Sequence, residues 1–203
     1  MILYGRNLSP FVRRVAIWCA FQQRVIERRH LSVAGDDFIE IGKHNPVARV
    51  PVLVLDDGTR LIETFSICDY LDATAPADAR LIPPAGAARM DCLQRIAVAN
   101  STSEKSVAMV YEKNRRPEEY QWPAWQDRLL TQIRGGLAAL NTQAAARRAA
   151  GSPPDGGDIA TIIACHFAAE TNPWLLDPGY EDLLAFADMA LAWPGVRETM
   201  PSV

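Results

Sequence analysis

Residues 45–71, NPVARVPVLVLDDGTRLIETFSICDYL, decide the fold of this chain. Val50 and Pro51 precede a short apolar run, which predicts a strand, because a strand tolerates proline at its first position but not in its middle. The turn sequence DDG at residues 56–58 predicts a hairpin, and residues 59–62 return as a second strand. The apolar period then changes to that of a helix. The stretch therefore predicts two antiparallel strands followed by a helix that begins near residue 64.

The composition is that of an ordinary soluble globular protein. The chain has 203 residues, of which 49% are hydrophobic and 22% charged, so it can bury a core in one large domain or two small ones. Its formal net charge of -3 gives no sign of a nucleic-acid partner. No apolar run reaches the roughly 18 residues of a membrane span, and residues 1–4 enter a strand without room for a signal peptide. We therefore expect no membrane partner.

Cysteine usage predicts neither disulfides nor a metal site. The chain has four cysteines, Cys19, Cys68, Cys92 and Cys165, and each stands alone in an apolar helical pattern. No CxxC pair and no Cys/His spacing of a metal site occurs. We expect four buried thiols in a reducing compartment, and no metal.

The residues before the central stretch predict a β-α-β unit. Residues 1–4 are expected to form a buried strand, and Pro10 takes a favoured first position of a helix. That helix has an apolar side, with Arg13 and Arg14 on the other side. A strand is expected within residues 25–33 and an irregular polar connection over 34–43. With the central stretch, the order becomes β-α-β, an irregular segment, then β-β-α.

The second half of the chain predicts helices. Residues 76–88 are rich in proline and lack useful periodicity, so they are the predicted linker between a domain at 1–75 and an all-helical domain at 89–203. The predicted helices are 90–111, 118–148, 158–170 and 181–192. Asp155, three residues before Asp158, is expected to cap the third of these helices.

Ser9 is the first candidate for chemistry. It precedes the helix that begins at Pro10, so a ligand near its hydroxyl would face the unsatisfied amides and positive dipole end of that helix. A thiol with a pKa of about 8.5 is mostly protonated at neutral pH. A donor hydroxyl and a helix end together would favour its thiolate. The alternative is a serine that only caps the helix.

Glu63 and Thr64 are the second candidates. If Thr64 begins a helix, its amide and hydroxyl can bind a carboxylate, and Glu63 can accept from an ammonium group. The head group of a free amino acid presents that pair of charges. The alternative is a helix cap beside a solvated acid.

The ordered pattern VPVL, DDG, ET and FSICDYL resembles the glutathione-binding half of cytosolic glutathione transferases. The Ser9-Pro10-Phe11 sequence resembles the motif of serine-type members of that superfamily, including plant tau-class and several bacterial proteins. The resemblance covers essentially the whole chain. It implies a thioredoxin-like N-terminal domain, an all-α C-terminal domain, a cis Val50-Pro51 bond and a cytoplasmic homodimer that acts in detoxification.

The resemblance also implies the residues that bind and activate glutathione. Ser9 would stabilise the thiolate, and Val50, next to Pro51, would hold the peptide through its backbone. Glu63 and Thr64 would bind the γ-glutamyl end. Asn7 and Tyr4 are the fallback activators. The implied co-substrate is glutathione, with no metal.

The helical domain is expected to supply the pocket for the electrophile. Ser103, Val107 and Tyr111 share one helical face near the expected inter-domain cleft and are the candidates for its lining; a helix-packing stripe is the alternative.

One departure from the pattern concerns the glycyl carboxylate of glutathione. Tau-type members often place a lysine before the third strand, but residues 34–42 offer no cation. Lys43, His44 and Arg49 are the possible substitutes. A non-catalytic module of this fold that binds ligands or proteins is therefore the alternative to a transferase. A glutathione-dependent isomerase, dehalogenase or peroxidase would use the same N-terminal site.

Overall fold

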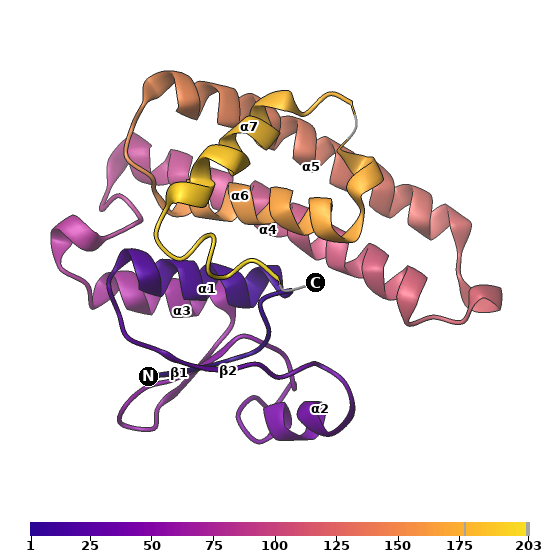
Figure 1. The fold of residues 1–203 in the computed structure, drawn as a ribbon, viewed down its shortest axis with the longest axis horizontal. Helices are drawn as coiled ribbons and strands as arrows, with labels where there is room; N and C mark the ends of the chain where they lie inside the picture. Colours follow the sequence, from indigo (N-terminus) through magenta and orange to yellow (C-terminus); the bar gives the residue numbers. More distant parts are fainter. Residues whose placement is uncertain (177, 202–203) are drawn as a thin grey trace. The chain divides into compact units, whose positions relative to one another are not determined.

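The computed structural model describes residues 1–176 and 178–201 of the chain. They divide into two compact units (Figure 1). The first joins Met1–Leu81 with the described residues from Leu191 onward, and the second is Ile82–Ala190. Every strand found in the described residues belongs to the first unit, and the second is built from helices. This confirms the predicted fold class, a thioredoxin-like α/β domain followed by an all-α region.

Four short strands form a mixed sheet in the order β2-β1-β3-β4. β1 runs parallel to β2 and antiparallel to β3, and β3 runs antiparallel to β4. At the centre of the sheet Leu3 pairs with Leu53, and both side chains are fully buried. The strands are β1 (Ile2–Tyr4), β2 (Glu27–Arg29), β3 (Val52–Val54) and β4 (Arg60–Ile62).

The central stretch of the sequence folds as predicted. β3 and β4 form its hairpin, and α3 (Thr64–Ala73) begins at the predicted residue. The apolar face of α3 is buried through Ile67, Cys68 and Leu71. The Val50-Pro51 bond is cis, as the resemblance implies.

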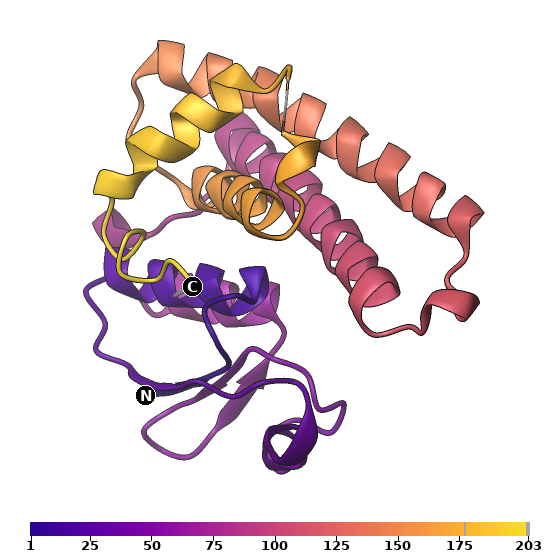
Figure 2. The same ribbon diagram turned by 45° about the vertical axis from the view of Figure 1, so that its right-hand side comes forward.

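Two further helices complete the first unit. α1 (Pro10–Phe21) packs against α3, and both lie on one side of the sheet, while α2 (Gly35–Gly42) lies on the other side (Figures 1 and 2). The prediction of an irregular connection was wrong at α2. Of its apolar residues, Ile41 is buried whereas Phe38 and Ile39 are exposed.

The helix α1 is buried on the side of Arg13 and Arg14 as well as on its apolar side. Arg13 and Arg14 are each only 2% exposed. A segment from the end of the chain, residues 191–201, covers this side and is called the C-terminal segment here. Arg13 donates from Nη2 to the carbonyl of Val196 (2.9 Å) and from Nε to Oγ1 of Thr199 (3.1 Å).

The C-terminal segment also packs against the other end of α1. The rings of Phe21 and Trp193 meet edge to face, with centroids 6.2 Å apart. The predicted domain boundaries placed this segment with the helices, whereas in the structure it groups with the first unit. The difference arises because its contacts with α1 are made by residues more than 170 positions away in sequence.

The second unit consists of long helices that lie side by side. Figure 2 shows α4 next to α5; α6 packs against α4, and α7 packs against α5. Three-residue 3-10 helices lie in the connections between helices. The long helices are α4 (Gly86–Asn114), α5 (Pro123–Ala150), α6 (Gly156–Thr171) and α7 (Glu181–Met189), and the 3-10 helices of the chain are η1 (Ala77–Ala79), η2 (Glu118–Tyr120), η3 (Pro173–Leu175) and η4 (Ala190–Ala192).

The cap predicted for α6 is present and is part of a larger ion-pair network. Oδ1 of Asp155 accepts from the amides of Gly157 (2.8 Å) and Asp158 (3.1 Å), and the Asp158 carboxylate accepts from the Asp155 amide (3.1 Å). Arg95 on α4 donates to both aspartates, and Arg147 near the end of α5 pairs with Asp158. The network therefore joins three helices of the second unit.

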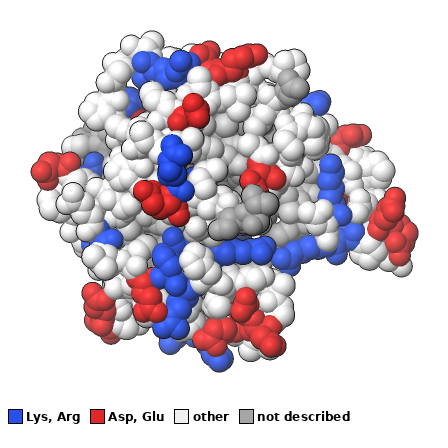
Figure 3. Space-filling view, in the orientation of Figure 1, with Lys and Arg blue, Asp and Glu red and all other residues white. Residues whose placement is uncertain are grey.

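Acidic and basic side chains both occur on the face shown in Figure 3, and the net charge of the chain is small. Among the residues that the structure describes, no helix has both the length and the apolar character needed to cross a membrane.

Candidate functional site

Ser9 lies at the N-terminus of α1 and caps it. Its Oγ accepts from the amide of Val12 at 3.4 Å, and Pro10 occupies the first turn. Within the described residues the Ser9 hydroxyl donates to no protein acceptor. A hydroxyl can donate one hydrogen bond while it accepts others. Ser9 therefore keeps its donor for a ligand at the positive end of α1.

The loop that carries Ser9 passes close to Val50. Gly5 has a φ of +119°, and a Cβ added there would lie 2.5 Å from Cγ2 of Val12 and 3.0 Å from Cβ of Val50. Only glycine fits at position 5, because the backbone has a positive φ there and a side chain would collide with Val12 and Val50. The backbone around Gly5 therefore brings the start of α1 and Val50 together.

Val50 presents an unpaired stretch of backbone. Among the described residues, neither its amide nor its carbonyl forms a hydrogen bond. Unpaired groups of this kind are able to add a ligand in the manner of a further strand. The first unit thus offers both a side-chain donor at Ser9 and a backbone donor and acceptor at Val50.

Asn45 holds the loop before Val50, a role that the sequence analysis missed. Its side chain is buried and donates to the carbonyl of Arg49 (2.7 Å), while its Oδ1 accepts from the amide of Val47 (3.0 Å). Asparagine commonly bonds nearby backbone in turns, and the Asn-Pro pair was the available signal. The loop conformation therefore depends on a polar residue that need not touch a ligand.

Glu63 and Thr64 lie at the N-terminus of α3. Glu63 has a φ of +71° and caps the helix, because its Oε2 accepts from the amides of Phe65 (3.0 Å) and Ser66 (3.2 Å). Thr64 is buried, and its hydroxyl donates to the carbonyl of Phe11 in α1 (3.4 Å). This bond links the starts of α1 and α3. The second oxygen of Glu63 and the Thr64 amide are the groups left for a ligand.

The three candidate cations near β3 differ in their environment. Glu40 pairs with Lys43 at 2.6 Å and with the half-buried His44 at 3.4 Å. The hydrogen bonds from Lys43 and then from His44 lower the pKa of Glu40. Within the described residues Arg49 makes no ion pair. Of the three, Arg49 is the cation whose charge is not already matched.

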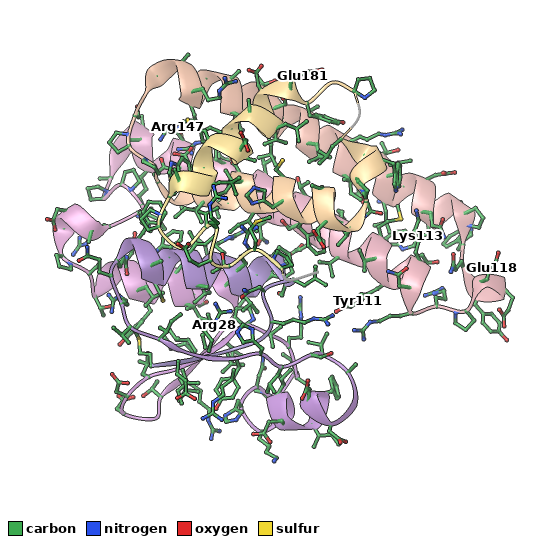
Figure 4. The ribbon with its side chains drawn as sticks, viewed as in Figure 1. Arg28, Tyr111, Lys113, Glu118, Arg147 and Glu181 are labelled. Atoms are coloured by element: carbon green, nitrogen blue, oxygen red, sulfur yellow. The ribbon has the colours of Figure 1, made fainter. Side chains whose placement is uncertain are left out.

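The fallback activators are both engaged in other contacts. Tyr4 is buried and stacks on His44, with ring centroids 4.4 Å apart. Asn7 accepts a hydrogen bond from Nη2 of Arg28 (2.8 Å), and burial lowers the pKa of Arg28 (Figure 4). Of the residues of this loop, Ser9 is the one whose spare donor lies at the N-terminus of α1.

The four cysteines are buried, as predicted, and none of them forms a disulfide. Burial raises the pKa of Cys19 to about 11 and of Cys92 and Cys165 to about 12, and it also raises the pKa of Cys68. Thiols with such pKa values are poor nucleophiles at neutral pH. Among the described residues, no group of His, Cys, Asp and Glu is arranged to hold a metal ion.

The candidate pocket residues of α4 range from buried to exposed. Ser103 is fully buried, Val107 is half-buried and Tyr111 is 43% exposed. Tyr111 lies on the last turns of α4, where the guanidinium of Arg115 covers its ring at 4.6 Å (Figure 4). Of this helical face, only the end at Tyr111 is well exposed within the second unit.

Comparison with known proteins places the chain in a family. Residues 3–79 match the family described as glutathione S-transferase, N-terminal domain. A glutathione transferase family member from Pseudomonas fluorescens Pf-5, solved with bound glutathione, is 30% identical with a TM-score of 0.86; the match covers 100% of this chain and 99% of that one. The chain therefore belongs to the glutathione transferase family.

Other solved structures are similar over almost the same length. A glutathione S-transferase from Methylobacillus flagellatus KT with glutathione bound is 26% identical, with a TM-score of 0.88 and 99% of each chain covered. A second structure from Pseudomonas fluorescens Pf-5, with bound S-(propanoic acid)-glutathione, is 26% identical, with a TM-score of 0.86 and 99% of each chain covered. The comparison with curated proteins gives no match.

Proposed function

We propose that this protein is a serine-type glutathione transferase, which joins the sulfur of glutathione to small, largely apolar electrophiles. The observation that carries the proposal is the Ser9 hydroxyl, which caps α1 and keeps its own hydrogen for a ligand. Relatives that cover nearly the whole chain bind glutathione or a glutathione conjugate. These two facts point to the same thiol ligand.

In the proposed mechanism Ser9 stabilises the thiolate rather than attacking. Its hydroxyl donates to the glutathione sulfur, and the amide end of α1 favours the negative charge. The thiol proton leaves to solvent. The thiolate then attacks an electrophilic carbon: in a substitution the new C–S bond replaces the bond to a leaving group, which departs with its electron pair. In an addition the carbon skeleton accepts a proton from water instead.

The remaining contacts of glutathione follow from groups that lack a protein partner. The amide and carbonyl of Val50 would pair with the cysteinyl backbone, with Pro51 directly after them. The Thr64 amide would bind the γ-glutamyl carboxylate, and the second oxygen of Glu63 would accept from its ammonium group. Arg49 is the proposed partner of the glycyl carboxylate.

The helical unit would hold the electrophile. Tyr111 is 43% exposed and offers the part of its ring that Arg115 does not cover, with Val107 and Ser103 on the same helix. The proposal includes the predicted first domain, 1–75, the linker, 76–88, and a helical domain that begins at residue 89. It also includes a homodimer in the cytoplasm with a role in detoxification.

The test is the conjugation of an aryl chloride such as chlorodinitrobenzene by Ser9→Ala. We expect kcat/KM to fall about 100-fold, because one preorganised donor to the reacting anion is lost. Ser9→Thr, which keeps a hydroxyl, should retain a large part of the activity. If Ser9→Ala reacts as fast as the parent protein, Ser9 does not have this role.

A specific observation favours a second candidate, a non-catalytic module of this fold. Both Lys43 and His44 are already paired with Glu40, and one oxygen of Glu63 is used in a helix cap. Glutathione affinity then rests on Arg49 and backbone groups. Calorimetric titration separates the two candidates, since a transferase must bind glutathione at millimolar concentration and the module need not.

A further inference from the structure

Arg28 on β2 is a half-buried cation whose charge no protein anion matches. Within the described residues its guanidinium makes no ion pair, and its Nε is buried without a hydrogen-bond partner. Among the same residues, the one titratable group whose charge acts on the pKa of Arg28 is Cys19 of α1. Burial raises the pKa of Cys19 to about 11, so this thiol is neutral at neutral pH. A desolvated charge of this kind favours an anion from outside the protein.

Arg28 also fixes the direction in which the side-chain amide of Asn7 points. Nη2 of Arg28 donates to Oδ1 of Asn7 at 2.8 Å (Figure 4). A guanidinium can only donate, so the oxygen of the amide faces Arg28 and its nitrogen faces away. Within the described residues Nδ2 of Asn7 donates to no protein acceptor. Asn7 therefore has two N–H donors to spare, and Arg28 keeps them from exchanging places with the oxygen.

The loop that carries Asn7 is short and is held at both ends. At its start, the amide of Gly5 donates to the carbonyl of Arg29 on β2 (2.8 Å). At its end, the amide of Ser9 donates to the carbonyl of Arg6 (3.1 Å), which closes a turn around Asn7. Two steps along the chain separate Asn7 from Ser9, so their Cα atoms are at most about 7 Å apart. The spare donors of both side chains therefore belong to one small piece of fixed backbone.

We propose that Asn7 is a second donor to the glutathione thiolate, acting together with Ser9, and that Arg28 is the positioning residue that aims its amide. This inference rests on the proposed transferase function. Arg28 prevents the Asn7 oxygen from turning towards the negative sulfur, and its unmatched charge favours an anion at this loop. No bond forms or breaks at either residue, and the proton of the thiol still leaves to solvent.

The main test is Asn7→Asp, in which ultraviolet absorbance follows the thiolate during a pH titration of the full chain with glutathione bound. Aspartate has the same shape and strengthens the bond from Arg28, so a purely structural role of Asn7 predicts an unchanged thiol. It also replaces the two donors by a negatively charged acceptor. We expect the pKa of the bound thiol to rise by at least about one pH unit. At neutral pH kcat/KM for chlorodinitrobenzene should fall at least about tenfold.

Two variants of Arg28 and a matched control test the positioning role. Arg28→Met removes the charge and lets the Asn7 amide turn over, so the pKa of the bound thiol should rise by about one pH unit. Arg28→Lys keeps a charged group that can only donate, and should stay within about threefold of the parent kcat/KM. Arg29→Met removes the next arginine of β2, which is exposed and pairs with Glu27, and should change neither quantity.

The results that would overturn the inference differ from those that would overturn the proposed function. If the parent protein forms a thiolate with glutathione and the folded Asn7→Asp protein has the same thiol pKa, Asn7 does not face the sulfur. Equal thiol pKa values in Arg28→Met and Arg28→Lys would remove the role of Arg28, whatever the stability of either variant. If the parent protein itself gives no thiolate signal with glutathione, the proposed function is wrong, and this inference is wrong with it.

Discussion

The N-termini of α1 and α6 meet the same physical need in opposite ways. Each begins with amides that have no partner inside the helix. At α6, Asp155 accepts two amides, Asp158 closes the box, and Arg95 binds both carboxylates. At α1, Ser9 accepts a single amide at 3.4 Å and keeps its hydroxyl hydrogen. One helix end is closed by protein groups, and the other has donors left over.

This difference separates a site for stability from a site for a ligand. The charges at α6 are matched within the helical unit: burial works against the charge of Arg95, but hydrogen bonds and the charge of Asp155 raise its pKa overall. The positive end of α1 has no acidic residue in its first turn. An anion from outside the protein is therefore more favourable at α1 than at α6.

The largest expected effect on stability comes from breaking the ion pairs of Asp158 at the N-terminus of α6. Asp158→Ala leaves Arg95 and Arg147 without their shared carboxylate, and we expect the free energy of unfolding to fall by about 3–5 kcal/mol. Urea denaturation measures it. The control is Asp182→Ala, which breaks the exposed pair with Arg148 (2.9 Å) and should change stability by less than about 1 kcal/mol. Equal losses in the two variants would contradict the comparison.

The next largest effect is on activity and comes from replacing Ser9 at the N-terminus of α1. Ser9→Asp keeps a good helix cap, so stability should change by less than about 1 kcal/mol. Its negative charge opposes a thiolate, which raises the pKa of the bound thiol and moves the rising limb of the pH–rate profile to higher pH. At neutral pH we expect kcat/KM to fall at least about 100-fold. An unchanged profile would show that no thiolate forms next to Ser9.

A smaller effect on stability is expected from the hydrogen bonds that join α1 to the C-terminal segment. Arg13→Met removes the donors to Val196 and Thr199, and burial already lowers the pKa of Arg13 to about 10. We expect a loss of about 2 kcal/mol, because two buried hydrogen bonds from a charged donor are lost. Hydrogen exchange of residues 193–200 should also become faster. Arg197→Met, an exposed arginine of the same segment, is the control and should change neither quantity.

The smallest effect tests which part of the α6 cap matters. Asp155→Ser keeps an oxygen that can accept the helix amides but removes the carboxylate that pairs with Arg95. We expect a loss of about 1 kcal/mol in unfolding experiments, because Arg95 keeps Asp158 and Asp91. A loss as large as that of Asp158→Ala would mean that the two aspartates act as one unit. A gain in stability would show that the Asp155 carboxylate is unfavourable where it is buried.

Local signals in the sequence identified much of the fold. The VP start of β3, the DDG turn and the change of period at Thr64 all correspond to elements of the structure, because strands, turns and helix starts depend on neighbouring residues. The Asp155 cap was found for the same reason. α2 was missed because it has only eight residues and both its first and its last residue are glycine, which is unfavourable in helices.

The candidate site was only partly visible in the sequence. Ser9, Val50, Glu63 and Thr64 were found from motifs, but how their polar groups are used was not. The capping bonds of Glu63 and the hydrogen bond from Thr64 to Phe11 depend on a backbone conformation that the pattern does not specify. The part that Asn45 plays before Val50 was missed because its bonds to Arg49 and Val47 depend on the conformation of the loop.

The sequence by itself determined the order of the strands and of the helices other than α2, the family, and the helix starts at Pro10 and Thr64, since these depend on residues close together in the chain. Only the tertiary structure decided which polar groups are already paired. Arg13 meets Val196 and Arg95 meets Asp155 across long separations in sequence, and no local pattern encodes such pairs. The N-termini of α1 and α6 therefore have similar sequence signals. They differ because Ser9 keeps a donor for a ligand, whereas the aspartates that cap α6 are paired with arginines.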